Sequence, residues 1–166
     1  MLFGKKLKFC IECEVTNSVE HFTFCQFRFW ISGQPVGNWN EEVVLESIIY
    51  CVEIFLKFRG LRYLTLADDT SSEQLWNHIT TYTYSNEPDI MLFGLKNNYR
   101  ARFLLHEVSV NSIQNYYEVI MAETNGGKQR LLWKLRSESI INEFIFAKFT
   151  VDDALEKFID WTNSIK

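Results

Sequence analysis

Three histidines are the side chains of this chain best suited to proton transfer at neutral pH. Together with carboxylates, His21, His78 and His106 could in principle form an acid–base site. Nothing in their spacing brings them together, because His21 opens a predicted strand, His78 lies on a predicted helix and His106 lies in a segment without a clear pattern. The sequence also lacks a Gly-x-Ser-x-Gly elbow, a Gly-rich phosphate loop and a His-Glu-x-x-His pair. A small hydrolase is therefore an alternative hypothesis, and we assign no catalytic residue.

Two of the four cysteines, Cys10 and Cys13, have the Cys-x-x-Cys spacing of many zinc sites. The surrounding residues predict a strand instead, because apolar and more polar residues alternate from Leu7 to Val15. An offset of three along a strand places two side chains on opposite faces, so these thiols cannot bind one ion. No second Cys-x-x-Cys or Cys-x-x-His motif follows. We expect no metal site, and we predict buried or half-buried free thiols.

Carboxylates gather in two loops of the middle of the chain. Asp68, Asp69 and Glu73 lie in the first loop, and Glu87 and Asp89 lie in the second. Hard divalent cations prefer such oxygen ligands, but the spacing does not match an EF-hand loop. The simplest interpretation is a solvated loop that caps a helix. The alternative is an acidic patch that faces a basic protein partner.

The composition favours a protein partner over a nucleic acid. The formal net charge of −4 does not suit phosphate neutralisation, which needs clustered lysine and arginine. Aromatic residues make up 16% of the chain, enough to build a core from bulky rings and leave some at an interface. No run approaches the roughly 20 apolar residues of a membrane span, and the N-terminus does not resemble a signal peptide. We expect one cytoplasmic domain over residues 1–166 that uses no cofactor and binds neither nucleic acid nor membrane.

An aromatic strand is the strongest local pattern. Residues 21–31 predict a strand whose apolar face changes near residues 25–26, which indicates a bulge or burial on both faces. A turn at residues 16–18 is predicted to connect it to the first strand. Most of these rings are expected in the core, and Trp30 or Trp39 could reach a binding surface, where Trp39 would act as an anchor.

Two amphipathic helices are predicted to cover a sheet. The longer covers about residues 41–59, with Asn40 as its N-cap, and the second covers about residues 151–165. Asn125-Gly126-Gly127 between two apolar runs predicts a β-hairpin at residues 116–136. Further strands are predicted at residues 61–66, 90–95, 102–107 and 140–149, and a short helix through Leu75, Trp76 and Ile79. The fold class is α+β, a single domain with a twisted, mostly antiparallel sheet packed against the two helices.

The end of the aromatic strand carries a distinctive glycine pattern, Ile31-Ser32-Gly33-Gln34-Pro35-Val36-Gly37. With the strand before it, this pattern resembles the strand and apolar-x-Gly-x-x-apolar-Gly segment of the Immunity protein 42 family, whose members look like antidotes encoded beside bacterial contact-dependent inhibition and other polymorphic toxins. Residues 3–12, 127–133 and 149–155 are also similar to this family, and roughly residues 64–115 are not covered.

The resemblance implies a protein that binds and neutralises the C-terminal domain of a cognate toxin, with a nuclease as one candidate activity. It implies no catalytic residues. An acidic surface would steer a basic toxin toward the protein, and aromatic anchors would hold it. A small hydrolase and a small-molecule-binding module with an aromatic pocket stay open as alternatives. The candidate partner-binding residues are Trp39, Asp68, Asp69, Glu73, Glu87 and Asp89.

Overall fold

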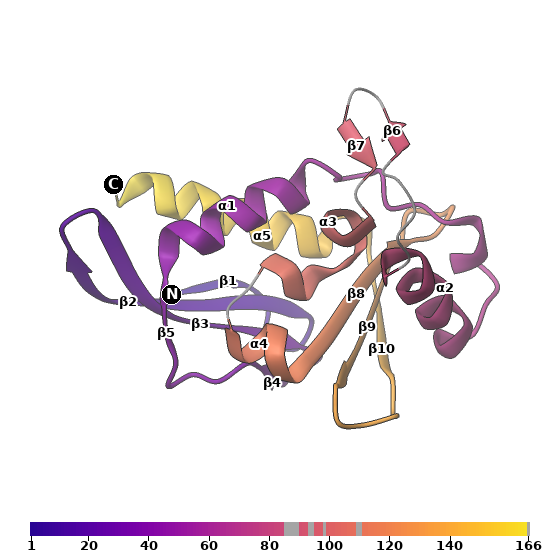
Figure 1. The fold of residues 1–166 in the computed structure, drawn as a ribbon, viewed down its shortest axis with the longest axis horizontal. Coiled ribbons are helices and arrows are strands. Elements are labelled where there is room, and N and C mark those ends of the chain that lie inside the picture. Colours follow the sequence, from indigo (N-terminus) through magenta and orange to yellow (C-terminus); the bar gives the residue numbers. More distant parts are fainter. Residues whose placement is uncertain (85–89, 93–94, 98, 109–110, 166) are drawn as a thin grey trace.

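The computed structural model describes residues 1–84, 90–92, 95–97, 99–108 and 111–165. Two antiparallel sheets lie side by side, with helices α1 and α5 over the first sheet and helix α2 at the far side of the second (Figure 1). This arrangement confirms the predicted α+β fold class, with two larger sheets and a two-stranded β6-β7 sheet in place of one sheet.

The first sheet has the order β1-β2-β3-β4, and β5 pairs with β3 beside β4. Its strands are β1 (Leu2–Gly4), β2 (Phe9–Val19), β3 (Phe22–Ile31), β4 (Gln34–Val36) and β5 (Glu42–Val44). The turn predicted at residues 16–18 is wrong, because those residues continue β2 and the turn follows at residues 20–21. The register shifts between Val15 and Asn17, opposite Cys25 and Phe24. The predicted irregularity therefore exists, but β2 carries the extra residue.

Helix α1 (Leu45–Leu56) is shorter than the predicted range of about 41–59 at both ends, because residues 57–60 form a turn. Residues 42–44 form β5 and pair with residues 24–26 of β3, so Val44 and not Asn40 precedes the helix. The two consecutive β-branched residues Val43 and Val44 favour a strand. Their positions also fit the helical spacing of the residues that follow, so the sequence pattern alone does not reveal the strand. The buried face of α1, which includes Ile48, Val52 and Phe55, packs into the core.

The second sheet has the order β10-β9-β8 and confirms the predicted hairpin. Its strands are β8 (Tyr117–Glu123), β9 (Gln129–Leu135) and β10 (Asn142–Phe146). In the hairpin loop, Gly127 adopts a φ of +72°, whereas Asn125 does not take a positive φ. The strand predicted at residues 140–149 is confirmed over a shorter range.

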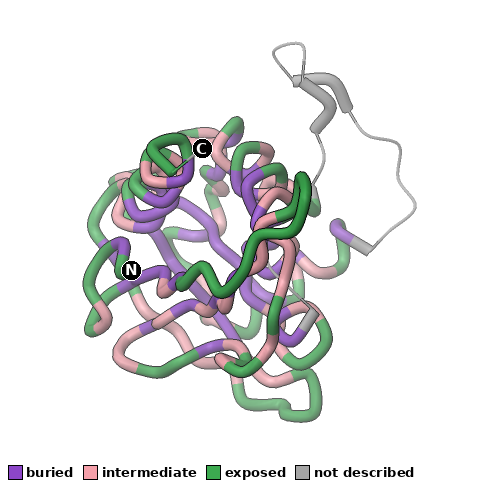
Figure 2. The backbone as a smooth tube through the Cα atoms, turned by 90° about the vertical axis from the view of Figure 1, so that its left-hand side faces the viewer, coloured by how far each residue is buried: buried purple, intermediate pink, exposed green. Residues whose placement is uncertain are grey.

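The second sheet is buried on both faces because it separates two hydrophobic cores. Alternate side chains, such as Val119 and Leu131, join the core formed with the first sheet, α1 and α5. The intervening ones, such as Ile120 and Leu132, join a second core formed with α2 (Ser72–Tyr84) and α3 (Tyr99–Phe103). The buried stretches of chain accordingly gather inside the molecule in Figure 2, with exposed stretches around them.

The closing helix α5 (Thr150–Ser164) is confirmed and packs against β1, β2 and α1. Two predicted strands are wrong. Residues 61–66 make one isolated bridge and lead into the 3₁₀ turn η1 (Thr65–Ala67). Residues 102–107 span the end of α3, an isolated bridge from Leu104 to Ile120, and the 3₁₀ turn η2 (Leu105–Val108). The remaining elements are β6 (Ile90–Leu92), β7 (Leu95–Asn97) and α4 (Asn111–Tyr116).

Gly37, the last residue of the glycine pattern at residues 31–37, directly follows β4. Its φ of +114° lies in the region that side chains rarely adopt. A Cβ atom at this position would also lie 2.8 Å from Cγ1 of Ile113 in α4. Glycine is therefore required both by the turn and by the contact between the first sheet and α4.

Candidate partner-binding surface

The outer face of the first sheet, turned away from α1 and α5, presents polar and aromatic side chains of β2 and β3. Successive side chains of a strand point to opposite faces, so Phe27 and Phe29 enter the core while Arg28 and Trp30 lie on the outer face. Arg28 and Trp30 are both partly exposed. The connection between β4 and β5 brings Trp39 to the same face.

Arg28 lies between two indole rings. Its guanidinium carbon is 4.7 Å from the ring centroid of Trp30 and 4.7 Å from that of Trp39. Lys6 Nζ is also 4.1 Å from the centroid of Trp30. Such cation–π contacts favour a fixed orientation of the flat guanidinium and the rings.

Glu12 completes this tryptophan–arginine cluster, which consists of Lys6, Glu12, Arg28, Trp30 and Trp39. Its carboxylate accepts hydrogen bonds from Arg28 Nε at 2.7 Å, Trp30 Nε1 at 2.7 Å and Lys6 Nζ at 3.2 Å. Burial acts to raise the pKa of Glu12, but the bonds from Trp30 and Arg28 hold this pKa below its ordinary value. The cluster is therefore ordered before any partner binds, which lowers the entropy cost of binding.

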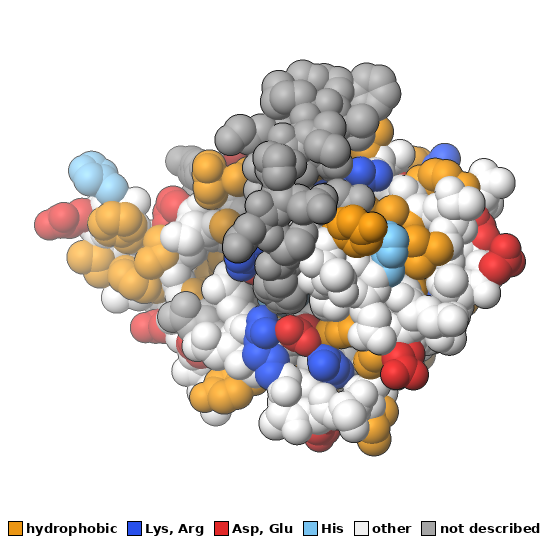
Figure 3. Space-filling view, turned by 45° about the vertical axis from the view of Figure 1, so that its right-hand side comes forward, with side chains coloured by type: hydrophobic (Ala, Val, Ile, Leu, Met, Phe, Trp, Pro, Cys, Tyr) orange, Lys and Arg blue, Asp and Glu red, His pale blue; other side chains and the backbone are white. Residues whose placement is uncertain are grey.

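The acidic candidates of the first loop lie beside the second sheet, whereas Trp39 lies in a connection of the first sheet. Asp68, Asp69 and Glu73 are exposed around η1 and the start of α2, beside the second sheet. Acidic side chains in this region are scattered among uncharged and basic ones and do not form one continuous patch on the face seen in Figure 3. Glu87 and Asp89 lie outside the described residues.

The expected capping role of the first acidic loop belongs to other residues. Ser71 Oγ accepts a hydrogen bond from the Gln74 backbone, and Gln74 Oε1 accepts one from the Ser71 backbone, which is a capping box at the start of α2. Asp68 instead accepts a hydrogen bond at 2.9 Å from the backbone of Asn125 in the β8–β9 loop. Asp68 thus has a structural contact, while Asp69 and Glu73 are exposed.

The histidines do not form an acid–base site. His21 lies in the β2–β3 turn and His78 on α2, beside Tyr82 with ring centroids 4.7 Å apart. His106 is buried in η2, where its Nδ1 accepts a hydrogen bond from the backbone of Val119 at 3.0 Å. Burial lowers the pKa of His106 below its ordinary value. The β2–β3 turn, which carries His21, and α2, which carries His78, lie at opposite ends of the long axis of the molecule (Figure 1).

The cysteines follow the sequence prediction. Cys10 and Cys13 are free and buried, and Cys13 alone of the two belongs to the core cluster next to Phe27. Across the residues that the structure describes, no three or more His, Cys, Asp or Glu side chains are placed to hold a metal ion. Within the same residues, no helix is both long and apolar enough to span a membrane.

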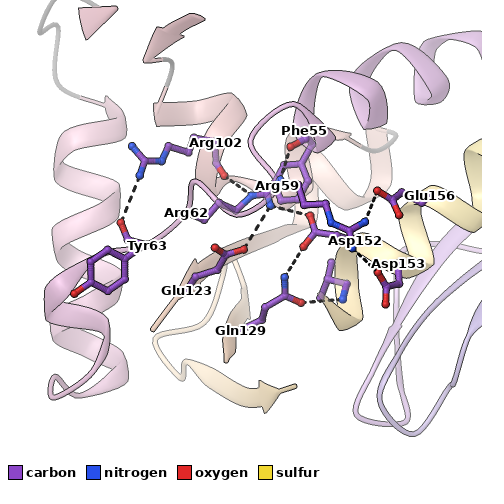
Figure 4. A network of polar contacts seen from close by, with 11 residues as sticks. Phe55, Arg59, Arg62, Tyr63, Arg102, Glu123, Gln129, Asp152, Asp153 and Glu156 are labelled. Atoms are coloured by element: carbon purple, nitrogen blue, oxygen red, sulfur yellow. Dashed lines mark hydrogen bonds and ion pairs between the residues drawn. The ribbon is translucent and has the colours of Figure 1, made fainter. Parts of the chain in front are cut away.

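A buried polar network, which the sequence patterns do not predict, joins α1, α3, α5 and the second sheet (Figure 4). Arg62 is fully buried and donates hydrogen bonds to Asp152 Oδ1 at 2.8 Å, to the Arg102 carbonyl at 2.9 Å and to the Phe55 carbonyl. Its guanidinium carbon also lies 3.8 Å from the ring centroid of Phe55. One side chain thus joins the end of α1, the end of α3 and the first turn of α5.

Gln129 of β9 extends this network to the second sheet. It donates to Asp152 Oδ2 at 2.5 Å and accepts a hydrogen bond from the Val151 backbone at 2.9 Å. Burial lowers the pKa of Arg62, and the carboxylates of Asp152 and Glu123 oppose that effect. The sequence signal for the network is an arginine within residues 61–66, a segment that the apolar pattern predicts as a strand.

Comparisons with known proteins extend over nearly the whole chain. Residues 1–161 match the family model described as Immunity protein 42. The crystal structure of CdiI from Burkholderia dolosa AUO158 has a similar fold, with a TM-score of 0.72, 15% sequence identity, and coverage of 96% of this chain and 99% of that one. No curated protein matches the chain in sequence. At 15% identity the structural likeness concerns the fold, whereas the family match concerns the sequence itself.

Proposed function

This chain belongs to the Immunity protein 42 family, and we propose that it binds the C-terminal domain of a cognate toxin and neutralises it in the cytoplasm. The match over residues 1–161 carries the proposal. Immunity proteins are typically toxin binders without enzymatic activity, so inhibition is expected to be stoichiometric. The inhibitor covers or distorts the toxin's active site for as long as the complex lasts.

The tryptophan–arginine cluster is the proposed anchor of the complex. Tryptophan and arginine are the residues that most often dominate binding energy at protein interfaces. Arg28 and Trp39 are partly exposed and already fixed by their mutual contact, so a partner would bury them at little entropy cost. Trp39 supplies a partly exposed indole ring from the connection between β4 and β5.

The exposed carboxylates of the first acidic loop are proposed to act at longer range. Asp69 and Glu73, with Asp68, add negative potential to a chain of net charge −4. Such a field accelerates encounter with a basic protein, such as a nuclease domain, even when the charged residues are not in the final contact. Steering therefore does not require these residues to lie beside Trp39.

Co-expression tests this function directly. The C-terminal domain of the toxin encoded next to this protein is expressed from an inducible promoter, with and without this chain. We expect growth to stop without the chain and to recover with it, and the two proteins to co-purify. Continued growth arrest together with the absence of a complex would reject the proposal.

A further inference from the structure

A groove lies on the inner side of the β2–β3 hairpin, where the hairpin extends past the end of α5 (Figure 1). The hairpin forms one wall, and the first turn of α1 and the last turn of α5 form the others. Its volume is about 550 Å³, and its apolar lining consists of Val15, Leu45, Trp161 and Ile165. We call it the hairpin groove.

The apolar surface around this groove is unusually accessible. Val15 is 38% exposed, and Ile165 is 47% exposed at the opposite wall. Val19 and Phe22, which flank the hairpin turn, are also exposed, but they lie on the opposite face of the hairpin from Ser18 and Thr23, which line the groove. Figure 3 shows hydrophobic side chains gathered on the hairpin at the left of the view. Exposed apolar side chains that cluster in this way are typical of a surface that a partner covers.

The charge of the groove is negative. Glu46 lines it, with Oε2 accepting a hydrogen bond from the Thr23 backbone at 3.2 Å. A second carboxylate, Glu42, lies on β5, the strand that immediately precedes α1, and does not line the groove. Among the described residues, no lysine or arginine lines the groove. The matching ligand therefore combines an apolar group with a cation.

The edge of β2 beside this groove offers backbone hydrogen-bonding groups. β1 pairs with β2 only at residues 10–12, and Cys13 bonds to Met1. From Glu14 to Val19, the side of β2 away from β3 has no strand partner within the described residues, and these residues are all exposed. An open edge of this kind readily pairs with an extended segment of another chain.

We propose that the hairpin groove receives an extended segment of the toxin domain in which an apolar residue is flanked by lysine or arginine. The segment pairs with β2 at residues 14–19, its apolar side chain fills the groove, and its cation lies against Glu46. This inference rests on the proposed function, because the toxin domain is the partner. It adds the docking surface and the chemistry of the segment that docks.

Substitutions in the groove, each with a matched control, test this proposal. The probe is the purified C-terminal domain of the toxin encoded next to this protein, and the readout is its affinity in calorimetric titration. Glu46→Gln keeps the hydrogen-bond acceptor and removes the charge, and Val15→Arg places a cation in the groove. We expect each to weaken binding by about tenfold or more. Glu53→Gln on the exposed face of α1 and Ile140→Arg, far from the groove, are expected to leave affinity within about twofold.

Hydrogen exchange of the wild-type complex tests the same site without any substitution, so the result does not depend on whether a variant folds normally. Binding is expected to slow exchange of the backbone amides at residues 14–19. If the wild-type complex forms while these amides exchange as before and Glu46→Gln binds normally, the docking site is wrong and the proposed function stands. If the wild-type protein neither binds nor rescues growth, the proposed function itself is wrong.

Discussion

Arg62 donates a hydrogen bond to Asp152 over 2.8 Å, and neither side chain is exposed to solvent. The pair connects the segment after α1 to the first turn of α5, 90 residues further along the chain. Because Gln129 of β9 also donates to Asp152, the pair joins the second sheet to the closing helix and to the end of α1. The partner-binding surfaces depend on this arrangement, since the hairpin groove uses the far end of α5.

Removal of the Arg62 side chain is expected to destabilise the fold strongly. Arg62→Met leaves Asp152 and Glu123 buried without their cation, which typically costs about 3–5 kcal/mol of unfolding free energy. Urea denaturation measures the loss. Arg59→Met is the matched control, because Arg59 pairs with Asp153 at the surface, where such a pair contributes about 0–1 kcal/mol. Equal effects of the two substitutions would contradict the role assigned to Arg62.

His106 is expected to make stability fall as the solution becomes acidic. Burial holds its folded-state pKa below the ordinary value of 6.5, so below that pH the unfolded chain binds a proton that the folded chain resists. The stability gained by keeping His106 neutral in the folded state is fully present above pH 6.5. It is lost as the pH falls below that value. His106→Asn offers an oxygen to the Val119 amide without titrating. The stability difference between wild type and variant should narrow from neutral pH to about pH 5, and a constant difference would refute the assignment.

Trp39 is expected to be a binding residue and not a folding residue. Trp39→Ala removes a partly exposed ring from one side of Arg28, so stability should change little, while affinity for the toxin domain should fall by about 30-fold or more. Tyr82→Ala, an exposed aromatic residue on α2, is the control and should bind as wild type does. Calorimetric titration and thermal unfolding of the same samples separate the two effects. Undiminished affinity of Trp39→Ala would exclude the cluster from the interface.

The acidic loop is expected to affect the rate of association. The double substitution Asp69→Asn and Glu73→Gln should lower the association rate constant at low salt and leave the dissociation rate nearly unchanged. Asp68 is left in place because it holds the Asn125 backbone. Glu53→Gln with Glu138→Gln removes the same charge elsewhere on the surface. Stopped-flow kinetics at several salt concentrations should give a slower association for the acidic-loop variant than for this control variant. Identical association rates for the two variants would mean that net charge alone, and not its location, sets the rate.

The elements with strong local signals were predictable from the sequence. α5 lies within one residue of its predicted bounds because its apolar stripe is regular, and the hairpin of β8 and β9 follows from the glycine-rich loop between two apolar runs. The start of α1 was misplaced because residues 42–44 fit a helical face as well as a strand. Only their pairing with β3, a contact between distant residues, decides between the two.

The candidate site was predictable only in part. Trp39 was predicted to be an aromatic anchor at a binding surface, but its contact with Arg28 depends on how the β4–β5 connection crosses the sheet. The hairpin groove escaped sequence analysis because the first long strand was expected to end before Thr16, which would leave no projecting hairpin. Arg62 was overlooked because its partners come from residues as distant as Asp152.

Titration of the toxin domain with this protein tests the central claim most directly. Heat of binding and residual toxin activity are followed together as the purified protein is added to the neighbouring toxin's C-terminal domain. We predict a tight complex with one protein per toxin domain, and activity that falls linearly to zero at one equivalent. Unchanged activity without binding would contradict the claim, and complete loss of activity far below one equivalent would indicate an enzyme instead of a stoichiometric inhibitor.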